Sequence, residues 1–355
     1  MTISNDLSDA LCATVRDAAE RKTPLVIYGG GSKAFYGRRV EGEPLAVAGH
    51  RGIVHYAPSE LVLSARAGTP LNEIEAALAQ AGQMLPFEPP HFGAGATLGG
   101  CVACGLSGPR RPHAGSVRDY VLGVTLVNGR GEHLRFGGEV MKNVAGYDVS
   151  RLMTGALGTL GVLLDVSLKL LPRPEQELTL ALALPAEPAI AAMNAWAATP
   201  LPLSACCHDG ERLVVRLSGA PSAVRAAHAR LGGEPLDNGA DYWGALREHA
   251  QPFFAGDAPL WRLSLPPATP PLDLPGAWLI DWGGAQRWLR SDAPDDAIRR
   301  AAAAAGGHAT LFRGGDRRGE VFAPLSDAVQ RWHRNLKQAF DPAGILNRGK
   351  MYSDI

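Results

Sequence analysis

The spacing of apolar residues predicts a helix at the start of the chain and two buried strands after it. The helix is expected over residues 7–21, where apolar side chains recur at helical intervals at Leu7, Leu11, Val15 and Ala18. Continuous apolar runs at 24–28 and 61–67 predict short buried strands. The first strand runs into Gly29-Gly30-Gly31-Ser32-Lys33, which indicates either an anion-binding loop or a plain tight turn.

A second helix is expected directly after the second strand. Leu71, Ile74 and Leu78 would share one face of it. Thr69 is the predicted N-cap, Pro70 suits the first helical position, and Gly82 would follow the end of the helix.

Apolar runs and turn signals predict a hairpin and a further strand in the middle of the chain. The runs 121–127 and 132–136 flank Asn128-Gly129, a pair that supplies the positive φ values of a tight hairpin turn. The stretch 155–171 is expected to form a turn followed by a buried strand. The double proline of Pro172-Arg173-Pro174 then predicts a domain boundary.

The second half alternates strand-like and helix-like segments, which is typical of an α+β domain with helices on one face of an antiparallel sheet. Strands are expected at 177–184, 212–217, 260–265 and 277–282, and helices at 221–231, 292–305 and 325–339. The tail from Phe340 to Lys350 is too rich in glycine and proline to be helical, yet too apolar to be a free end.

Glycine is concentrated in the stretch 93–170, where it occurs sixteen times among mostly uncharged residues. Glycine tolerates positive φ and has no Cβ that would keep a ligand away from the backbone. The amide groups exposed by such turns can bind an anionic group such as a pyrophosphate. The stretch is therefore predicted to hold a large phosphorylated cofactor.

Composition and charge exclude several other functions for the 355 residues. Lysine plus arginine and aspartate plus glutamate both number 35, so no basic excess favours nucleic acid. No apolar run approaches the length of a membrane span, and residues 1–9 predict no signal peptide. Five irregularly spaced cysteines indicate a reducing compartment, so the cytoplasm is expected.

Four motifs, taken in order, resemble the vanillyl-alcohol-oxidase/PCMH superfamily of FAD enzymes. The resemblance is strongest to its 2-hydroxy-acid branch, and there to the FAD-binding E subunits of bacterial glycolate oxidase (glycolate dehydrogenase). The motifs are the Gly29 loop, Ala96-Thr97-Leu98-Gly99-Gly100 with Gly105 to Pro109, Lys142 to Asp148 continuing to Gly158 to Val162, and Phe340-Asp341-Pro342 with Gly344 to Asn347.

The resemblance implies an α+β architecture in three parts. Residues 1–172 would form a PCMH-type FAD-binding domain of two subdomains. Residues 173–316 would form a reduced α+β cap, or substrate, domain, and residues 317–355 a helix and tail that return to the FAD domain.

The resemblance also implies which residues contact the cofactor. Gly29, Gly30, Gly31, Ser32, Thr97, Gly99 and Gly100 would lie at the pyrophosphate, and Ser107 and Gly108 along the ribityl chain or flavin. Gly158, Gly161 and Val162 would contact the flavin or adenine side, and Lys142, Asn143 and Tyr147 would shape the flavin site.

Two departures from the family pattern refine this expectation. Relatives with covalent flavin carry a histidine in the first glycine loop, where this chain has Ser32 and Lys33, so non-covalent FAD is expected. Catalytic relatives carry a histidine-rich metal signature and a Gly-Glu-His-Gly run in the substrate domain, and here Phe312-Arg313 or a near neighbour stands in place of the Glu-His. Arg313 is the candidate for binding a substrate carboxylate, or else a surface arginine, and no metal is expected.

The implied function is glycolate oxidation to glyoxylate within a complex that contains a catalytic D-type flavin subunit and an iron–sulfur subunit. Such a complex would pass electrons towards membrane quinone, so the chain would be cytoplasmic or held at the membrane through its partners. The alternatives are a stand-alone FAD-dependent dehydrogenase of small 2-hydroxy acids, or a flavin-fold scaffold that never turns over.

Three other features have a functional and a structural interpretation. Cys101 and Cys104 have redox or zinc spacing, but without a second pair a structural role is favoured. His113 is either a proton shuttle or a hydrogen-bonded turn residue. Arg110 and Arg111 either attract an anion or are solvated.

Overall fold

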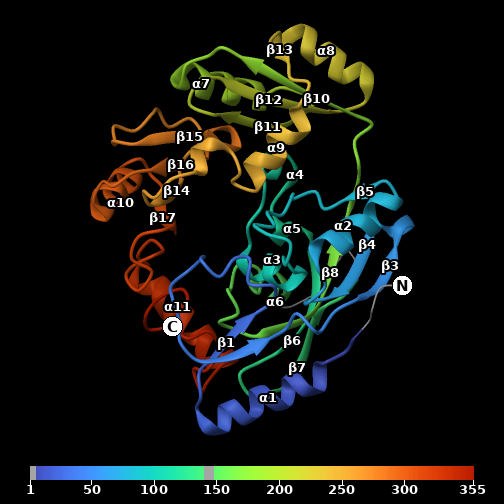
Figure 1. Cartoon of the computed structure of the whole chain (residues 1–355), viewed down its shortest axis with the longest axis vertical. Helices are drawn as coiled ribbons and strands as arrows, with labels where there is room; N and C mark the ends of the chain where they lie inside the picture. Colours follow the sequence, from blue (N-terminus) through green and yellow to red (C-terminus); the bar gives the residue numbers. More distant parts are fainter. Residues whose placement is uncertain (1–4, 140–147) are drawn as a thin grey trace.

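The computed structural model describes residues 5–139 and 148–355 and separates two sheets in space (Figure 1). The chain passes from the larger sheet of the first half to the second sheet near residue 172, and it returns to the core of the first half after residue 313. The predicted domain bounds at 172 and 316 are drawn from the sequence and stay a prediction.

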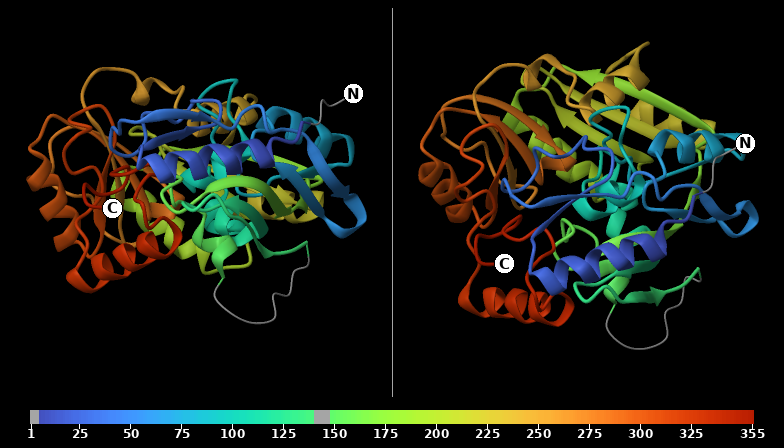
Figure 2. Two further views of the ribbon diagram at one scale, coloured as in Figure 1. Left: turned by 90° about the horizontal axis from the view of Figure 1, so that it is seen from below. Right: turned by 60° about the horizontal axis from the view of Figure 1, so that its bottom comes forward.

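The first sheet is antiparallel, with strand order β3-β4-β8-β6-β7. Its strands are β3 (Ile53–Ala57), β4 (Val62–Arg66), β6 (Val121–Val127), β7 (His133–Gly137) and β8 (Val162–Lys169). The central strand β8 has the apolar run Val162, Leu163 and Leu164 buried, as expected for a strand covered on both faces. Helix α1 (Ser8–Arg21) buries the predicted stripe in the same core, on the side away from the second sheet (Figure 2).

Short elements surround this sheet. They are η1 (Pro58–Glu60), α2 (Leu71–Gln80), β5 (Gln83–Met84) paired with β9 (Leu171–Pro172), α3 (Leu98–Cys104), α4 (Arg111–Ala114), α5 (Val117–Tyr120) and α6 (Val149–Leu152). The predicted hairpin is confirmed as β6 and β7.

The C-terminal tail returns to the first half beside the parallel pair β1 (Leu25–Tyr28) and β2 (Glu43–Ala46). The Leu25 amide donates to the Ile345 carbonyl, and the Asn347 amide donates to the Leu25 carbonyl. The tail that follows α11 (Asp327–Phe340), drawn in red in Figure 1, therefore pairs in parallel alongside the first residue of β1.

The second sheet has eight strands in the order β13-β10-β12-β11-β15-β16-β14-β17. Their bounds are β10 (Gln176–Leu182), β11 (Leu203–His208), β12 (Leu213–Gly219), β13 (Glu234–Pro235), β14 (Leu260–Ser264), β15 (Ala277–Asp281), β16 (Gln286–Arg290) and β17 (His308–Arg313). The connecting helices are α7 (Ala186–Ala197), α8 (Pro221–Leu231), α9 (Gly239–Arg247), η2 (Pro252–Phe254), η3 (Trp282–Gly284) and α10 (Asp295–Ala304).

The helices divide between the two faces of this sheet. Ile190 of α7, Val224 of α8 and Ile298 of α10 are all buried against one face of the sheet, as the alternation of strand and helix predicts. Helix α9 departs from that expectation, because its Trp243 packs on the opposite face with residues of the first half such as Tyr36. That opposite face is therefore the contact between the two halves.

Two local predictions were wrong for identifiable reasons. Thr69 does not cap α2, because its hydroxyl contacts the backbone of Gly52, and Pro70 takes the N-cap position without a side-chain bond. The hairpin loop does not use positive φ at Asn128 and Gly129. The Asn128 carboxamide accepts from two later amides, and the positive φ, +72°, falls on Gly131.

Candidate functional site

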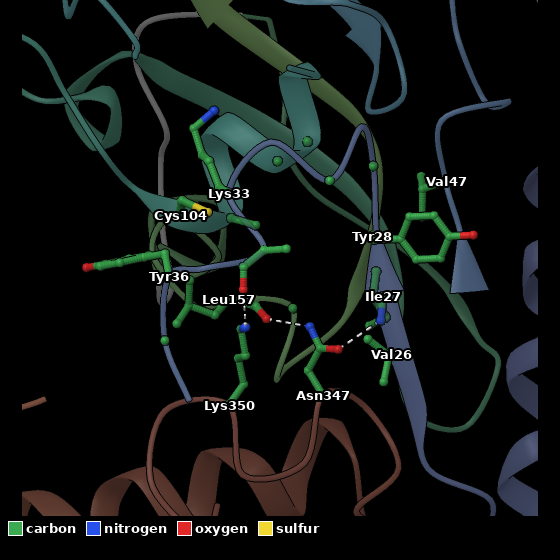
Figure 3. A pocket seen from close by; sticks show the side chains of 18 of the residues that line it. Val26, Ile27, Tyr28, Lys33, Tyr36, Val47, Cys104, Leu157, Asn347 and Lys350 are labelled. Carbon is green, nitrogen blue, oxygen red and sulfur yellow. Dashed lines mark hydrogen bonds between the residues drawn. The ribbon is translucent and has the colours of Figure 1, made fainter. Parts of the chain in front are cut away.

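A cavity of about 490 Å³ lies between β1, α3, the loop before β8 and the C-terminal tail (Figure 3). Predicted residues among its walls are Gly29, Gly30, Gly31, Ser32, Thr97, Gly99, Gly100, Gly158 and Gly161. The folding of four distant segments thus brings most of the glycine motifs to one place. A cavity of this size suits a small-molecule cofactor.

The loop after β1 offers unused backbone donors to this cavity. Within the described residues, the amides from Gly29 to Lys33 have no hydrogen-bond acceptor, although the loop closes with bonds from Ala34 to Gly31 and from Tyr36 to Lys33. Consecutive free amides of this kind are the donors that an anionic group such as a pyrophosphate requires.

Several glycines are required by packing rather than by a ligand. A Cβ on Gly30 would overlap the Gly95 carbonyl, and one on Gly29 would overlap the Thr97 hydroxyl. At Gly99 a Cβ would lie 2.7 Å from the Cβ of Ala67, and the Gly99 amide already donates to the Ala67 carbonyl. These contacts hold the first loop, α3 and β4 together at the cavity wall.

Gly31 and Gly100 differ, because the protein leaves space in front of them. A Cβ on Gly31 would meet nothing within 4 Å, although its φ of +72° disfavours other residues. A Cβ on Gly100 would meet only the Thr97 hydroxyl, at 3.2 Å. Gly100 is therefore the wall glycine at which a larger side chain can be placed without disturbing the backbone.

The C-terminal tail closes the cavity through Asn347. The sequence placed Asn347 in a family motif but did not predict that it lines the cofactor cavity. Its carboxamide accepts from the Ile27 amide at 2.8 Å and donates to the Leu157 carbonyl at 2.7 Å (Figure 3). It thereby fixes β1 against the loop that carries Gly158. The sequence feature that pointed to this role is the polar Asn347 directly after the apolar pair Ile345-Leu346.

Four cationic residues also line the cavity, namely Lys33, Arg39, Arg317 and Lys350. Lys33 is buried and its Nζ donates to the His91 carbonyl at 3.1 Å. Burial lowers the pKa of Lys350, whose Nζ lies 3.4 Å from the Ala34 carbonyl (Figure 3). The four positive charges make the cavity favourable for an anionic ligand.

The remaining predicted cofactor residues lie elsewhere. Ser107 and Gly108 line a second, smaller cavity beside the second sheet, and Val162 begins β8 without being part of either wall. Lys142, Asn143 and Tyr147 lie outside the described residues.

The predicted anion residues occupy aromatic surroundings. The Arg313 guanidinium lies 4.3 Å from the ring centroid of Phe35, and it lines neither cavity. Arg110 is buried and pairs with Glu88 and Glu177, whereas Arg111 lies over Trp282. Neither Arg110 nor Arg111 is simply solvated.

The cysteine pair and His113 show the effects of burial. Burial raises the pKa of Cys101 to about 12 and that of Cys104 to about 11, and both thiols are free. Burial also lowers the pKa of His113. Over residues 5–139 and 148–355 no group of three or more potential ligands gathers to hold a metal ion. The same part of the chain contains no helix with the length and apolar character that crossing a membrane requires.

Comparison with known proteins gives this geometry a context. Residues 6–137 match the FAD binding domain family. The glycolate oxidase subunit GlcE of Escherichia coli is 55% identical over 350 residues, 99% of each chain. The glycolate oxidase subunit GlcD of Bacillus subtilis is 30% identical over 49% of this chain and 37% of its own.

A solved structure extends the comparison to the whole fold. The 4-ethylphenol oxidase from Gulosibacter chungangensis aligns with a TM-score of 0.72 at 16% identity, over 99% of this chain and 89% of the other. At this identity the likeness concerns the fold, and it covers both sheets.

Proposed function

Because the chain belongs to the family of FAD-binding glycolate oxidase subunits, we propose that it binds FAD within a complex that oxidises glycolate to glyoxylate. The observation that carries the proposal is the glycine-walled cavity with its row of free amides. Its volume, its donors and its positive charge fit a large anionic cofactor.

Each wall of the cavity has a role in holding the cofactor. The amides from Gly29 to Lys33 would bind the pyrophosphate, and Gly100 would let it approach α3. Asn347 would keep the opposite wall in place through its two backbone partners. When bound, FAD supplies the acceptor for the hydride from the α-carbon of the 2-hydroxy acid, and the protein supplies orientation and electrostatics.

The proposed partners are a GlcD-type flavin subunit and an iron–sulfur subunit that takes electrons towards membrane quinone. The subunit naming of both glycolate oxidase relatives supports a multi-chain assembly. In this arrangement the chain reaches the membrane only through its partners, and the D-type subunit carries the main substrate site.

Purification of the complex and of the single chain tests this function. The complex is expected to contain FAD in this chain, and glycolate is expected to bleach flavin absorbance in the complex. Turnover of glycolate with a dye acceptor by the single chain would instead favour a stand-alone dehydrogenase. A complex in which this chain's flavin never bleaches would favour a scaffold.

The FAD is expected to be non-covalent. The first loop has Ser32 and Lys33 at the place where covalent attachment of the flavin would need a histidine. The Lys33 ammonium donates a hydrogen bond to the His91 carbonyl. Acid precipitation should therefore release all the yellow cofactor into the supernatant. Flavin retained in the washed protein pellet would contradict this expectation.

A further inference from the structure

A loop of the first half, residues 105–110, is held by the second sheet at two separate points. At the first point the Trp282 indole N–H donates to the Gly108 carbonyl at 3.1 Å. The second point is a buried group of charged side chains. The loop directly follows α3, which lines the large cavity, and it leads into α4, which Figure 1 shows next to the second sheet. It therefore connects a wall of the cavity to the second sheet.

The charged group balances two carboxylates against two guanidinium groups. The Glu88 carboxylate accepts from the Arg110 amide at 3.0 Å, and from Nη2 of Arg216 in β12 at 3.0 Å. Glu177 of β10 pairs with the same Arg110. Both arginines are buried, so the loss of one partner would leave a charge that is costly to keep out of water. This charged group and the Trp282 contact together are named the clamp.

The clamp contains backbone conformations that are costly for residues other than glycine. Glu88 has a φ of +45° and Trp282 a φ of +52°. The Asp281 carboxylate holds Trp282 by accepting from its amide at 2.7 Å. Gly108 lies so close to Glu88 that a Cβ on it would be 2.3 Å from the Glu88 carbonyl oxygen. Strain of this kind is found at clamping and switching segments, and its release would offset part of the cost of separating the contacts.

An apolar seam continues from the clamp to the large cavity. In it Leu106 of the loop, Tyr36 and Leu157 form one buried cluster with Trp243 and Phe312 of the second half. Tyr36 and Leu157 also line the large cavity. The same side chains therefore complete the cavity wall and hold the second half, so a separation of the halves along this seam would uncover the cavity.

The connection that follows β17 permits such a separation. The chain crosses between the halves near residue 172 and again after residue 313. At the second crossing Gly314 and Gly315 have φ values of +76° and +61°. Glycine changes its backbone angles at little steric cost, and a few residues at the ends of elements can absorb a hinge motion. The non-covalent contacts of the clamp and the seam therefore decide whether the halves stay together.

Building on the proposed function, we propose that the clamp controls the entry and the release of FAD. In the closed state the seam residues complete the cavity wall, and the loop fixes the end of α3. When the clamp separates, the halves rotate apart and the cofactor exchanges with solution. FAD contacts walls that are complete only in the closed state, so a bound cofactor favours closure and a closed clamp retains the cofactor.

Two mild substitutions weaken the clamp without changing the shapes of its side chains. Glu88→Gln removes the charge that Arg110 and Arg216 share. Trp282→Phe removes the N–H that donates to Gly108 and keeps a ring beneath the guanidinium of α4.

The rates of FAD exchange test the proposal. Uptake is measured by mixing the flavin-free full chain with FAD, and release by diluting the loaded chain, with flavin fluorescence as the signal in both cases. The Glu88→Gln, Trp282→Phe double variant is expected to take up and release FAD about ten- to a hundredfold faster than wild type. Both rates rise because a weaker clamp opens more often, whereas the loss of a contact with the cofactor would speed release alone.

Matched controls carry the same replacements at exposed positions. Glu211→Gln and Trp332→Phe should exchange FAD at the wild-type rates. Trp282→Phe alone should speed both directions about three- to tenfold, and it keeps the test valid if the Glu88 variant fails to fold.

Two outcomes would overturn the clamp while the proposed function stands. Faster release with unchanged uptake in the double variant would show that these residues only add to FAD affinity. Unchanged rates in both directions would show that the contact between the halves is fixed and that FAD exchanges by another route. A wild-type chain that takes up no FAD would contradict the proposed function and the clamp together.

Discussion

A Gly100→Val variant is expected to lose at least a hundredfold in FAD affinity, about 2.7 kcal/mol, while the chain still folds. Gly100 belongs to α3 and lines the large cavity. Because a Cβ there would meet only the Thr97 hydroxyl, at 3.2 Å, the added methyl groups project into the space proposed for the pyrophosphate.

The measurement is the flavin absorbance of the purified variant, together with its thermal unfolding. Gly244→Val is the matched control, since Gly244 is also helical, a Cβ there meets nothing within 4 Å, and it does not line either cavity. Both variants should unfold near the wild-type temperature. A stable Gly100→Val chain that keeps its full FAD content would show that Gly100 is only a helix residue.

The comparison with Gly30 separates the two kinds of glycine. At Gly30 the missing Cβ would overlap the Gly95 carbonyl, so Gly30→Ala should disturb the backbone itself. Sequence reasoning assigned both glycines to the pyrophosphate. The sequence indicates that a side chain is excluded at both positions. Only the fold shows that Gly30 faces the backbone of another loop, whereas Gly100 faces the open cavity.

Prediction from sequence succeeded where one local property decides the structure. The stripe of α1 and the apolar runs of β1, β4 and β8 were found because burial on one or both faces leaves a direct periodic signal. The bounds of α8, Pro221–Leu231, follow from its proline start and glycine end in the same way.

Prediction failed where a distant contact overrides a local preference. Threonine is a residue type that commonly caps helices, yet the Thr69 hydroxyl accepts a hydrogen bond from the backbone amide of Gly52, seventeen residues earlier in the chain. Gly129 lies in the predicted turn but does not supply its positive φ, which falls on Gly131, and a Cβ on Gly129 would overlap Asp341 of the tail.

Asp341, which lies against Gly129, forms a buried ion pair with Lys337, and this pair anchors the tail. Lys337 Nζ donates to Asp341 at 2.7 Å and to the carbonyls of Thr159 and Leu346. The Asp341 carboxylate also accepts from the amides of Ile345 and Leu346. This network places Asn347 next to β1, so the stability of the tail and the shape of the large cavity are coupled.

Lys337→Met is therefore expected to lower the free energy of unfolding by about 3 kcal/mol and to weaken FAD binding as well. Burial lowers the pKa of Lys337, which shows that the ammonium loses solvation, but its removal leaves the Asp341 charge and two carbonyls without their shared donor. Arg331→Met, on the exposed side of the same helix, is the control and should change stability by less than about 0.5 kcal/mol. Denaturant unfolding with and without added FAD measures both effects. Equal stability of Lys337→Met and wild type would mean that the two amides alone satisfy Asp341 and that the tail is held by its strand contacts with Leu25.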